Sequence, residues 1–427
     1  MMRQQYVARS VTEVFDFSLR PREFVRRLGW SSLTVALSRG KGVLVLPLVL
    51  LILGSGGYGT VTVVLSAASA LAPLALLNIP DGVTRLIVGS DPLRAEARLA
   101  KVRLGALISA AGLVLLAAVI AVGFGSYVAT WVCINAAAAV IFKAGTVHMQ
   151  YFQLAQSLTR YTLAAEYISA ALALPVALWL GVSGYLATNA LILAVVAVPA
   201  WRTMSAHSSV TDDPDFWGPA VRLSLPLLPA SFAQWALFSL DALLVYDILG
   251  KQATGAYSTA YSVAAVGLIM PIALTSTWPQ TAQRLRDKGG KHLHNMLSML
   301  LGIVGVSGVG LVALALLSRP LLRTVLHGAV FANVPSCLVW IIVGFALLGF
   351  ARLFEGILYA AGFPFAILGA YVVAAALNLG LNLVWIPEYG IRGAAYATAA
   401  GYAVLTISLL LLTRLLPRQS TEEVSCA

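Results

Sequence analysis

Apolar segments of about twenty residues recur along nearly the whole chain, separated by short stretches of Gly, Pro or charged residues. An α-helix rises about 1.5 Å per residue, so such a segment can cross a hydrocarbon core of about 30 Å. Only 11% of the residues are charged, against about 25% in an average soluble domain. The sequence therefore predicts an all-α polytopic membrane protein. Its twelve predicted transmembrane helices lie at about 30–53, 58–80, 104–122, 127–147, 161–180, 183–201, 223–249, 256–278, 296–317, 335–359, 365–386 and 391–415.

The distribution of Lys and Arg predicts the orientation of these helices. With the N-terminus placed inside, 22 of the 28 Lys and Arg residues fall in cytoplasmic segments and 4 in external loops. Because cytoplasmic loops of membrane proteins collect positive charge, both termini are predicted to be cytoplasmic, in a plasma (inner) membrane. The same bias accounts for the net charge of +11, so that charge does not indicate a nucleic-acid partner.

Two short motifs recur about 200 residues apart and in the same order. I-L-G-S-G-G-Y-G from Ile52 returns as I-L-G-K-Q-A-T-G-A-Y from Ile248, and L-G-V-S-G-Y-L-A-T from Leu180 is echoed by Y-G-I-R-G-A-A-Y-A-T from Tyr389. This indicates a duplication of six helices, with the two halves related by a pseudo-two-fold axis along the membrane normal. The predicted division is a cytoplasmic leader at 1–29, an N-terminal lobe at 30–205, a cytoplasmic linker at 206–219, a C-terminal lobe at 220–416 and a cytoplasmic tail at 417–427.

These motifs also carry a family resemblance. The segments P-L-L-P from Pro226, S-L-D-A-L-L-V from Ser239 and I-L-G-x-x-x-x-G-x-Y-S from Ile248 resemble the start of the second half of polysaccharide and lipid-linked oligosaccharide flippases. N-L-G-L-N-L-V-W-I-P-E-Y-G-I-R-G from Asn378 resembles their last helical hairpin. Those proteins belong to the multidrug/oligosaccharidyl-lipid/polysaccharide exporter superfamily. The resemblance implies a non-enzymatic flippase that moves an isoprenoid diphosphate oligosaccharide by alternating access, for cell-surface polysaccharide biosynthesis.

The resemblance implies partners as well as a function. They are a lipid-linked anionic glycan, membrane lipids and, as candidates, a polysaccharide polymerase and glycosyltransferases. A cation-coupled drug or metabolite exporter of the same superfamily is the alternative, and an integral membrane glycan polymerase or transferase is the second alternative. The short external loops disfavour that enzyme. A major-facilitator sugar transporter is disfavoured because the loop after the second helix lacks the full G-x-x-x-D-R-x-G-R-R pattern.

Two cations, Arg39 and Lys41, lie near the middle of the first predicted helix. Each costs about 2.5–3.5 kcal/mol to insert there. One interpretation is that they snorkel or form ion pairs that hold the lobes together, Lys41 with a carboxylate such as Asp241 or Glu355. The other is that they line a cavity for an anionic substrate. Arg39 is then the primary phosphate contact, because a guanidinium binds phosphate oxygens in bidentate fashion.

Three intramembrane carboxylates are predicted to couple transport to a cation or to serve as structural groups. Glu166 is expected to face Lys143 across a short loop. Asp241 lies within the long apolar segment 223–249 and requires a partner, water or a function. Glu355 lies three residues after Arg352, so the two can pair on one helix face.

Two asparagines, Asn378 and Asn382, lie four residues apart and therefore on one helix face. They are predicted to hydrogen-bond another helix or to line the cavity. No cofactor or metal site is predicted, since His292 and His294 have no Cys or carboxylate at ligand spacing. No G-x-x-x-x-G-K-[ST] motif occurs, so ATP is not predicted as a direct energy source.

Overall fold

The computed structural model describes residues 21–87, 92–151, 155–205, 215–287, 290–325 and 331–415, and every regular element in these ranges is a helix. The N-terminal elements are α2 (Pro21–Ala75), α3 (Ile79–Ile87), α4 (Pro92–Gly123), α5 (Tyr127–Tyr151) and α6 (Ala155–Ser205). They are followed by α7 (Trp217–Ser224), η1 (Leu225–Leu227), α8 (Leu228–Trp235), η2 (Ala236–Leu240), α9 (Asp241–Leu249), α10 (Lys251–Ala264), η3 (Ala265–Leu268), α11 (Ile269–Asp287), α12 (Gly290–Val325), α13 (Val334–Ala360), α14 (Pro364–Tyr389) and α15 (Ile391–Leu415).

Ten helices in the described ranges are long and apolar enough to cross a membrane. Two continuous elements, α2 and α6, are each broken at a glycine with positive φ, Gly54 and Gly181. Residues with a Cβ rarely adopt this conformation, so glycine allows the helix to change direction within one residue. Each broken element supplies two of the predicted helices, which brings the number to twelve and confirms the predicted fold class. The loops expected at these two points are therefore single residues.

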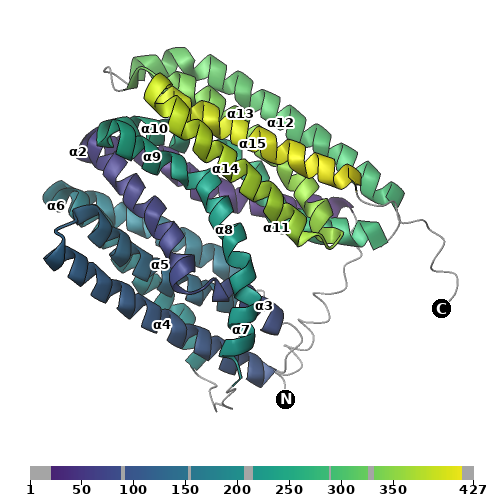
Figure 1. Cartoon of the computed structure of the whole chain (residues 1–427), viewed down its shortest axis with the longest axis horizontal. Helices are drawn as coiled ribbons and strands as arrows, with labels where there is room; N and C mark the ends of the chain where they lie inside the picture. The colour runs from purple at the N-terminus through teal and green to yellow at the C-terminus, as the bar shows by residue number, and fades with distance from the viewer. Residues whose placement is uncertain are drawn as a thin grey trace.

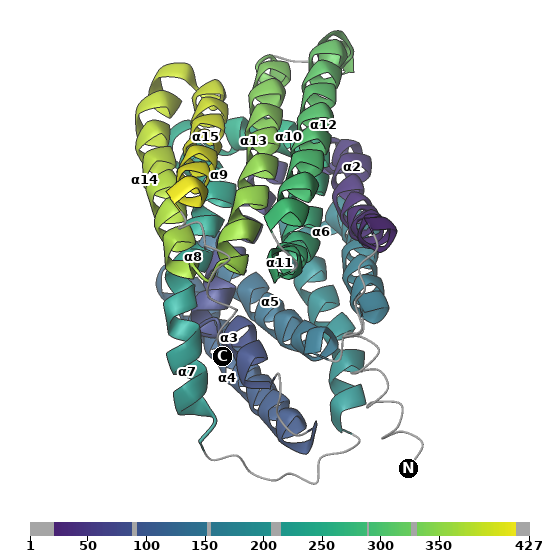
Figure 2. The ribbon, with the colours of Figure 1, turned by 90° about the vertical axis from the view of Figure 1, so that its right-hand side faces the viewer.

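The helices form two lobes (Figures 1 and 2). The hydrophobic core of one lobe is built from residues of α8 to α15, and a separate core is built mainly from α2 to α5. Phe216, immediately before α7, and Ala220 of α7 belong to the core of the N-terminal lobe, so α7 packs there although it follows the linker in sequence. The predicted linker residues 206–214 lie outside the described residues, and the exact lobe boundary stays a prediction.

The backbone repeats the duplication that the motifs predicted. Gly54 has φ 67° and ψ 176°, and Gly250 has φ 85° and ψ 174°. Gly181 has φ 59° and ψ −141°, and Gly390 has φ 63° and ψ −143°. Both pairs occupy equivalent positions in the two motifs, which confirms the repeat. We call the end of the bundle that holds these four glycines the glycine end.

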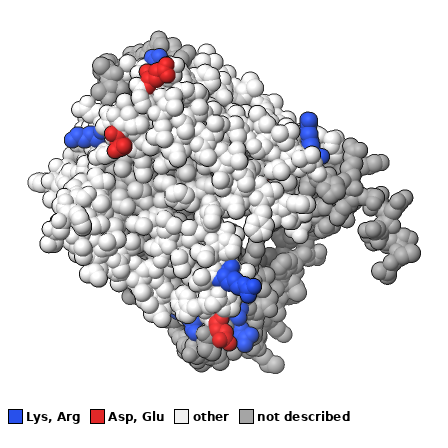
Figure 3. Space-filling view, viewed as in Figure 1, with Lys and Arg blue, Asp and Glu red and all other residues white. Residues whose placement is uncertain are grey.

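The surface is that of a multi-pass membrane protein. On the face shown in Figure 3, Lys, Arg, Asp and Glu gather toward the periphery, and a broad uncharged area lies between them. Large apolar side chains are exposed across the helices, for example Leu115 at 68%, Leu178 at 67% and Val306 at 76%. A soluble monomer rarely exposes such a continuous apolar surface, whereas lipid covers it at no cost.

Candidate functional site

The most polar site in the core of the C-terminal lobe is built around Asp241, which is 2% exposed. Asn382 donates its Nδ2 hydrogen to Asp241 Oδ1 at 2.7 Å. Tyr257 donates its hydroxyl to Asp241 Oδ2 at 3.0 Å, and the Thr398 hydroxyl donates to the same oxygen. Asn378 completes the group, because its Oδ1 accepts from Asn382 Nδ2 at 3.1 Å. We call these five residues the Asp241 cluster.

Four helices bring the Asp241 cluster together. Asp241 is the first residue of α9, Tyr257 lies on α10, and Thr398 lies on α15. Asn378 and Asn382 lie one turn apart on α14, and the predicted common face is the one that meets α9. The structure therefore unites three of the residues that the sequence singled out, and Asn382 bonds to a carboxylate of another helix.

The Asp241 cluster offers mostly oxygen atoms. Besides the carboxylate it holds the side-chain oxygens of Asn378 and Asn382, and the Thr398 hydroxyl, whose oxygen also lies 2.8 Å from Ala394 O. Asn382 Oδ1 is buried and has no hydrogen-bond partner in the structure. Carboxylate, carbonyl and hydroxyl oxygens suit hard cations, and an unpartnered buried oxygen is a free ligand for one. Within the described ranges, no group of three or more His, Cys, Asp and Glu side chains gathers as a metal site would.

A second buried polar group lies in the same lobe, and we call it the Arg352 cluster. Arg352 donates to Glu355 Oε2 at 2.7 Å, as predicted from their spacing, and Tyr371 donates to the same oxygen at 3.0 Å. With its amide oxygen turned toward Arg352, Gln234 accepts from the guanidinium at 3.1 and 2.6 Å. Arg352 and Glu355 are 7% and 6% exposed. This cluster ties α8, α13 and α14 together and balances its own charge.

The N-terminal lobe has an uncharged counterpart of the Asp241 cluster. Ser169 donates to Asn189 Oδ1 at 3.0 Å, and Asn189 Nδ2 donates to Asn135 Oδ1 at 3.0 Å. Ser169 lies as far before Gly181 as Asn378 lies before Gly390, and Asn189 occupies the position of Thr398 in that register. The residue that corresponds to Asp241, nine positions before the first glycine of its motif, is Val45. Among the described residues, the buried charged side chains Asp241, Arg352 and Glu355 all lie in the C-terminal lobe.

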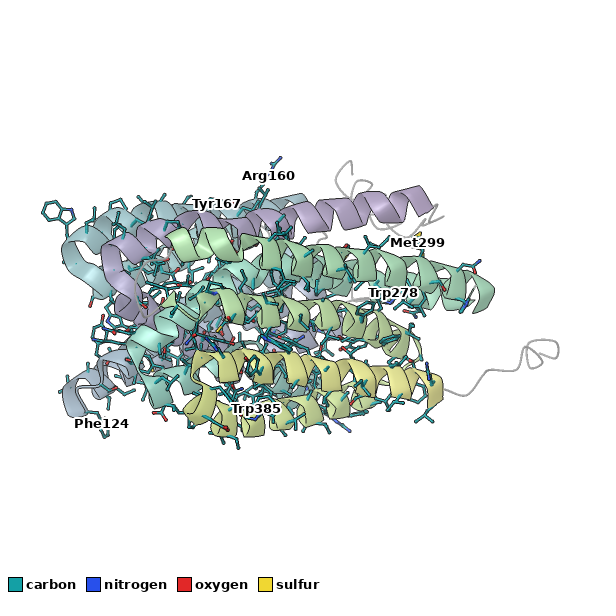
Figure 4. The ribbon with its side chains drawn as sticks, turned by 90° about the horizontal axis from the view of Figure 1, so that it is seen from above. Phe124, Arg160, Tyr167, Trp278, Met299 and Trp385 are labelled. Atoms are coloured by element: carbon teal, nitrogen blue, oxygen red, sulfur yellow. The ribbon has the colours of Figure 1, made fainter. Side chains whose placement is uncertain are left out.

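The remaining predicted residues lie in the N-terminal lobe. The side chains of Arg39 and Lys41 fall outside the described residues, so their roles and their proposed ion pairs stay predictions. Nearby, Tyr167 of α6 donates to Leu37 O of α2 at 2.7 Å, and Figure 4 shows Tyr167 beside that helix. Glu166 is partly buried and Lys143 is exposed, and their pairing also stays a prediction.

Two members of the Asp241 cluster were not predicted as site residues. Tyr257 and Thr398 both stand in the motifs of the repeat, Tyr257 at the end of I-L-G-K-Q-A-T-G-A-Y and Thr398 at the end of Y-G-I-R-G-A-A-Y-A-T. Neither recurs at the equivalent position of the first half, where Val61 and Asn189 stand, so the only signal available was that both residues lie in the repeated motifs. The sequence does not predict that these two motifs pack against α9, where Asp241 lies.

The two lobes meet along a seam between α2, with the turn that follows it, and the segment from α8 to α11. Four hydrogen bonds among the described residues cross the seam, from one end of α10 to the start of α8. They are Ser55 Oγ to Gln252 O at 2.8 Å, Tyr58 Oη with Ser262 Oγ at 2.6 Å, Trp235 Nε1 to Ser66 O at 2.9 Å, and Asn78 Nδ2 to Ser231 Oγ at 3.1 Å.

At the glycine end the seam is a crossing of two glycines, Gly59 and Gly255. A Cβ added to Gly59 would lie 2.1 Å from Lys251 O, and one added to Gly255 would lie 1.9 Å from Ser55 O. Gly59 and Gly255 are equivalent in the repeat, as are Ser55 and Lys251, so each lobe presents the same contact to the other. Backbone meets backbone here, and only glycine allows that approach.

Comparisons with known proteins agree with this architecture. No family model matches the chain. It is 29% identical over 176 residues to the probable low-salt glycan biosynthesis flippase Agl15 of Haloferax volcanii, and 25% identical over 185 residues to the probable flippase AglR of the same organism. These matches cover 39% and 42% of this chain, and only 36% and 38% of the length of the two relatives.

Solved structures cover nearly all of the chain. The lipid II flippase MurJ in an inward closed conformation superposes with a TM-score of 0.70 at 14% identity, over 91% of this chain and 88% of that one. An inward-facing multidrug resistance MATE family transporter of the MOP superfamily superposes with a TM-score of 0.64 at 14% identity, over 92% and 97%. The chain thus has the two-lobed fold of these transporters, and the resemblance to the flippases and exporters of this superfamily, predicted from the sequence, is confirmed.

Proposed function

We propose that this protein is a flippase that moves a lipid-linked oligosaccharide, carried on an isoprenoid diphosphate, across the plasma membrane by alternating access of its two lobes. Three observations support the proposal. Two relatives are named as flippases, and one of them as a glycan biosynthesis flippase. The chain has two lobes related by a repeat, and these lobes meet along a single seam. A buried carboxylate, Asp241, lies in one lobe only, where a transporter would hold a coupling ion.

The observation that carries the coupling part of this proposal is the unpartnered oxygen beside Asp241. We infer that the Asp241 cluster binds a monovalent coupling cation, and Na⁺ is the ion that we test. With its amide turned, Asn382 Oδ1 can ligate Na⁺, and it can equally accept a hydrogen bond from a protonated Asp241. In the described arrangement the Asn382 amide donates to Asp241, so cation binding requires this amide to turn and present its oxygen.

The coupling site is tested by measuring Na⁺ binding to the purified protein by calorimetry. Asp241→Asn removes the charge and keeps the shape, and we expect it to weaken Na⁺ binding at least tenfold, which is about 1.4 kcal/mol. Asp247→Asn is the matched control, because Asp247 lies on the same helix but is exposed. If the parent binds no Na⁺ and Asp241→Asn still abolishes transport, the coupling ion is the proton. If Asp241→Asn binds and transports normally, the carboxylate is structural.

For the substrate we propose Arg39 and Lys41 as cavity cations. A diphosphate carries two or more negative charges and cannot enter hydrocarbon unaided, and fixed cations offset its lost hydration. We expect Arg39→Ala to abolish surface-glycan export in a strain lacking the native gene, with protein abundance near normal. Arg39→Lys should retain part of the export. Arg160→Ala is the control, because the exposed Arg160 points away from the bundle in Figure 4. Full export by Arg39→Ala would show that this cation is not the phosphate contact.

A cation-coupled drug or metabolite exporter remains the second candidate, and it is favoured by Asp241 together with the fold shared with the MATE transporters. One assay distinguishes the flippase from the cation-coupled exporter. Membrane vesicles that expel a cationic dye under a Na⁺ gradient, with no effect of gene deletion on surface glycan, would replace the flippase proposal by the exporter.

A further inference from the structure

The helix that carries Asp241 changes its winding immediately before that residue. Residues Ala236–Leu240 form η2, a π-helical turn between α8 and α9. A π turn has hydrogen bonds from residue i to i+5 and is rare; it occurs mostly as a single turn inside an α-helix, frequently at a functional site. Such a turn inserts one extra residue. If η2 reverted to α-helix, α9 would rotate by about 100° and shift by about 1.5 Å relative to α8.

Two tyrosine hydroxyls bind the backbone of η2 from different helices. Tyr261 of α10 donates to Phe238 O at 3.0 Å, and Tyr402 of α15 donates to Leu237 O at 3.3 Å. Their rings pack in a cage, with Phe238 edge-on to Tyr402 at 5.8 Å and Phe345 edge-on to Tyr261 at 5.3 Å. A hydrogen bond from a side-chain hydroxyl to a backbone carbonyl stabilises the helical form in which that carbonyl is available as an acceptor. The two tyrosine hydroxyls therefore stabilise the π form of η2.

The residues that flank η2 contact different lobes. Trp235, the last residue of α8, donates across the seam to Ser66 O at 2.9 Å. Asp241, the first residue of α9, faces Asn382, Tyr257 and Thr398 inside its own lobe. Because a change in η2 would rotate one end against the other, Trp235 and Asp241 can keep both sets of contacts only while η2 stays π-helical.

We propose that Tyr261 and Tyr402 are positioning residues that hold η2 in its π form, and that η2 links the state of Asp241 to the seam between the lobes. The inference rests on the proposed coupling role of Asp241. In the described state Asp241 accepts three donors and the seam is closed at the glycine end. A cation must displace those donors, so it favours the other winding of η2 and an open seam.

The experiment measures closure of the seam in liposomes containing the full chain. Cysteines replace Ser55 and Gln252 in a background without native cysteines. The Ser55 hydroxyl donates to the backbone carbonyl of Gln252 across the glycine end. We measure their disulfide yield under a mild oxidant, with NaCl titrated against choline chloride at constant ionic strength. In the parent, NaCl should lower the yield, and Asp241→Asn should abolish that response.

Removal of both hydroxyls, in Tyr261→Phe with Tyr402→Phe, should lower the Na⁺ concentration of half-maximal effect about fivefold or more. The described state then loses two hydrogen bonds, each of which contributes about 2- to 10-fold to an equilibrium. Tyr396→Phe is the control, because that ring lies on α15 and packs against Trp340. A general loss of folding would reduce the amount of protein without moving this concentration. Each single Tyr→Phe variant should give an intermediate shift, which covers the case in which the double variant is poorly made.

The outcomes separate the two proposals. If Asp241→Asn abolishes the response and the tyrosine variants respond like the parent, η2 is not the link, and the coupling role of Asp241 stands. If Asp241→Asn keeps the response, the coupling proposal fails, and if the parent has no response, Na⁺ is not the coupling ion. Hydrogen exchange at residues 236–241 then decides the local part of the inference, because loss of the hydroxyls should accelerate exchange there at least fivefold relative to Tyr396→Phe. Equal exchange would overturn it.

Discussion

The glycine crossing gives the sharpest prediction about how the lobes move. Gly59→Ala places a methyl group 2.1 Å from Lys251 O, and Gly255→Ala places one 1.9 Å from Ser55 O, when real Cβ atoms approach other atoms no closer than 3.0 Å. The obstacle in both cases is backbone, which cannot rotate away as a side chain can. To accept either methyl group, α2 and α10 must move apart by about 1 Å at the glycine end. Overpacking of this kind costs about 1–3 kcal/mol.

That cost falls on one state only. The crossing exists when the seam is closed, so the added methyl groups penalise the closed state and leave the open state unchanged. A cost of about 1–3 kcal/mol shifts the ratio of open to closed molecules by about 5- to 150-fold. Both substitutions should therefore trap the protein with its glycine end open and stop transport, while the folded protein is still made.

The assay is the disulfide yield between cysteines placed at positions 55 and 252. We expect at least a fivefold lower yield in Gly59→Ala and in Gly255→Ala than in the parent. Gly112→Ala is the control, because a Cβ at that helical glycine meets no atom within 4 Å. Equal yields in the parent and in Gly59→Ala would refute the reasoning, since they would mean that the helices close over a methyl group that the geometry excludes.

Three further predictions concern the rest of the molecule. A cysteine at Gly184 should react with an impermeant thiol reagent in intact cells and one at Lys288 only after lysis; the reverse pattern would contradict cytoplasmic termini. Exchanging Glu166 and Lys143 should retain most of the transport activity if the two only pair, and loss of activity at normal protein abundance would instead favour ion coupling by the carboxylate. Glu355→Gln leaves the adjacent buried guanidinium uncompensated, so thermal unfolding should reveal a loss of about 3–5 kcal/mol, and unchanged stability would show that the charge pair is not structural.

The parts of the site that sequence predicts are those with a local signal. Asp241 stands out because a carboxylate inside a long apolar segment has a cost that must be met. Asn378 and Asn382 stand out through their four-residue spacing, which places them on one face of a helix. Gly54 and Gly250 stand out because each lies at the same position of a repeated I-L-G motif. In each case the physics that marks the residue acts within one helix.

The parts that sequence misses depend on contacts between helices. Nothing local indicates that Tyr257 and Thr398 donate to one carboxylate, because they lie more than 140 residues apart on different helices. The π turn at η2 has no composition of its own, and its two stabilising hydroxyls come from α10 and α15. Sequence also placed the start of the eighth helix at 256, whereas α10 begins at Lys251, because the single residue Gly250 makes the whole turn.

The repeat gives a reason why the buried charges among the described residues lie in the C-terminal lobe. Val45 and Ala173 occupy, in the N-terminal lobe, the positions that Asp241 and Asn382 occupy in the C-terminal lobe. Burying the carboxylate requires donors that hold it, and Asn382, Tyr257 and Thr398 supply them. The N-terminal lobe keeps the neutral pair Ser169 and Asn189, which satisfy each other without a charge. A carboxylate at position 45 alone would therefore lack the amide that corresponds to Asn382, so the duplicated scaffold holds this carboxylate at its position in the C-terminal lobe and not at the equivalent position of the N-terminal lobe.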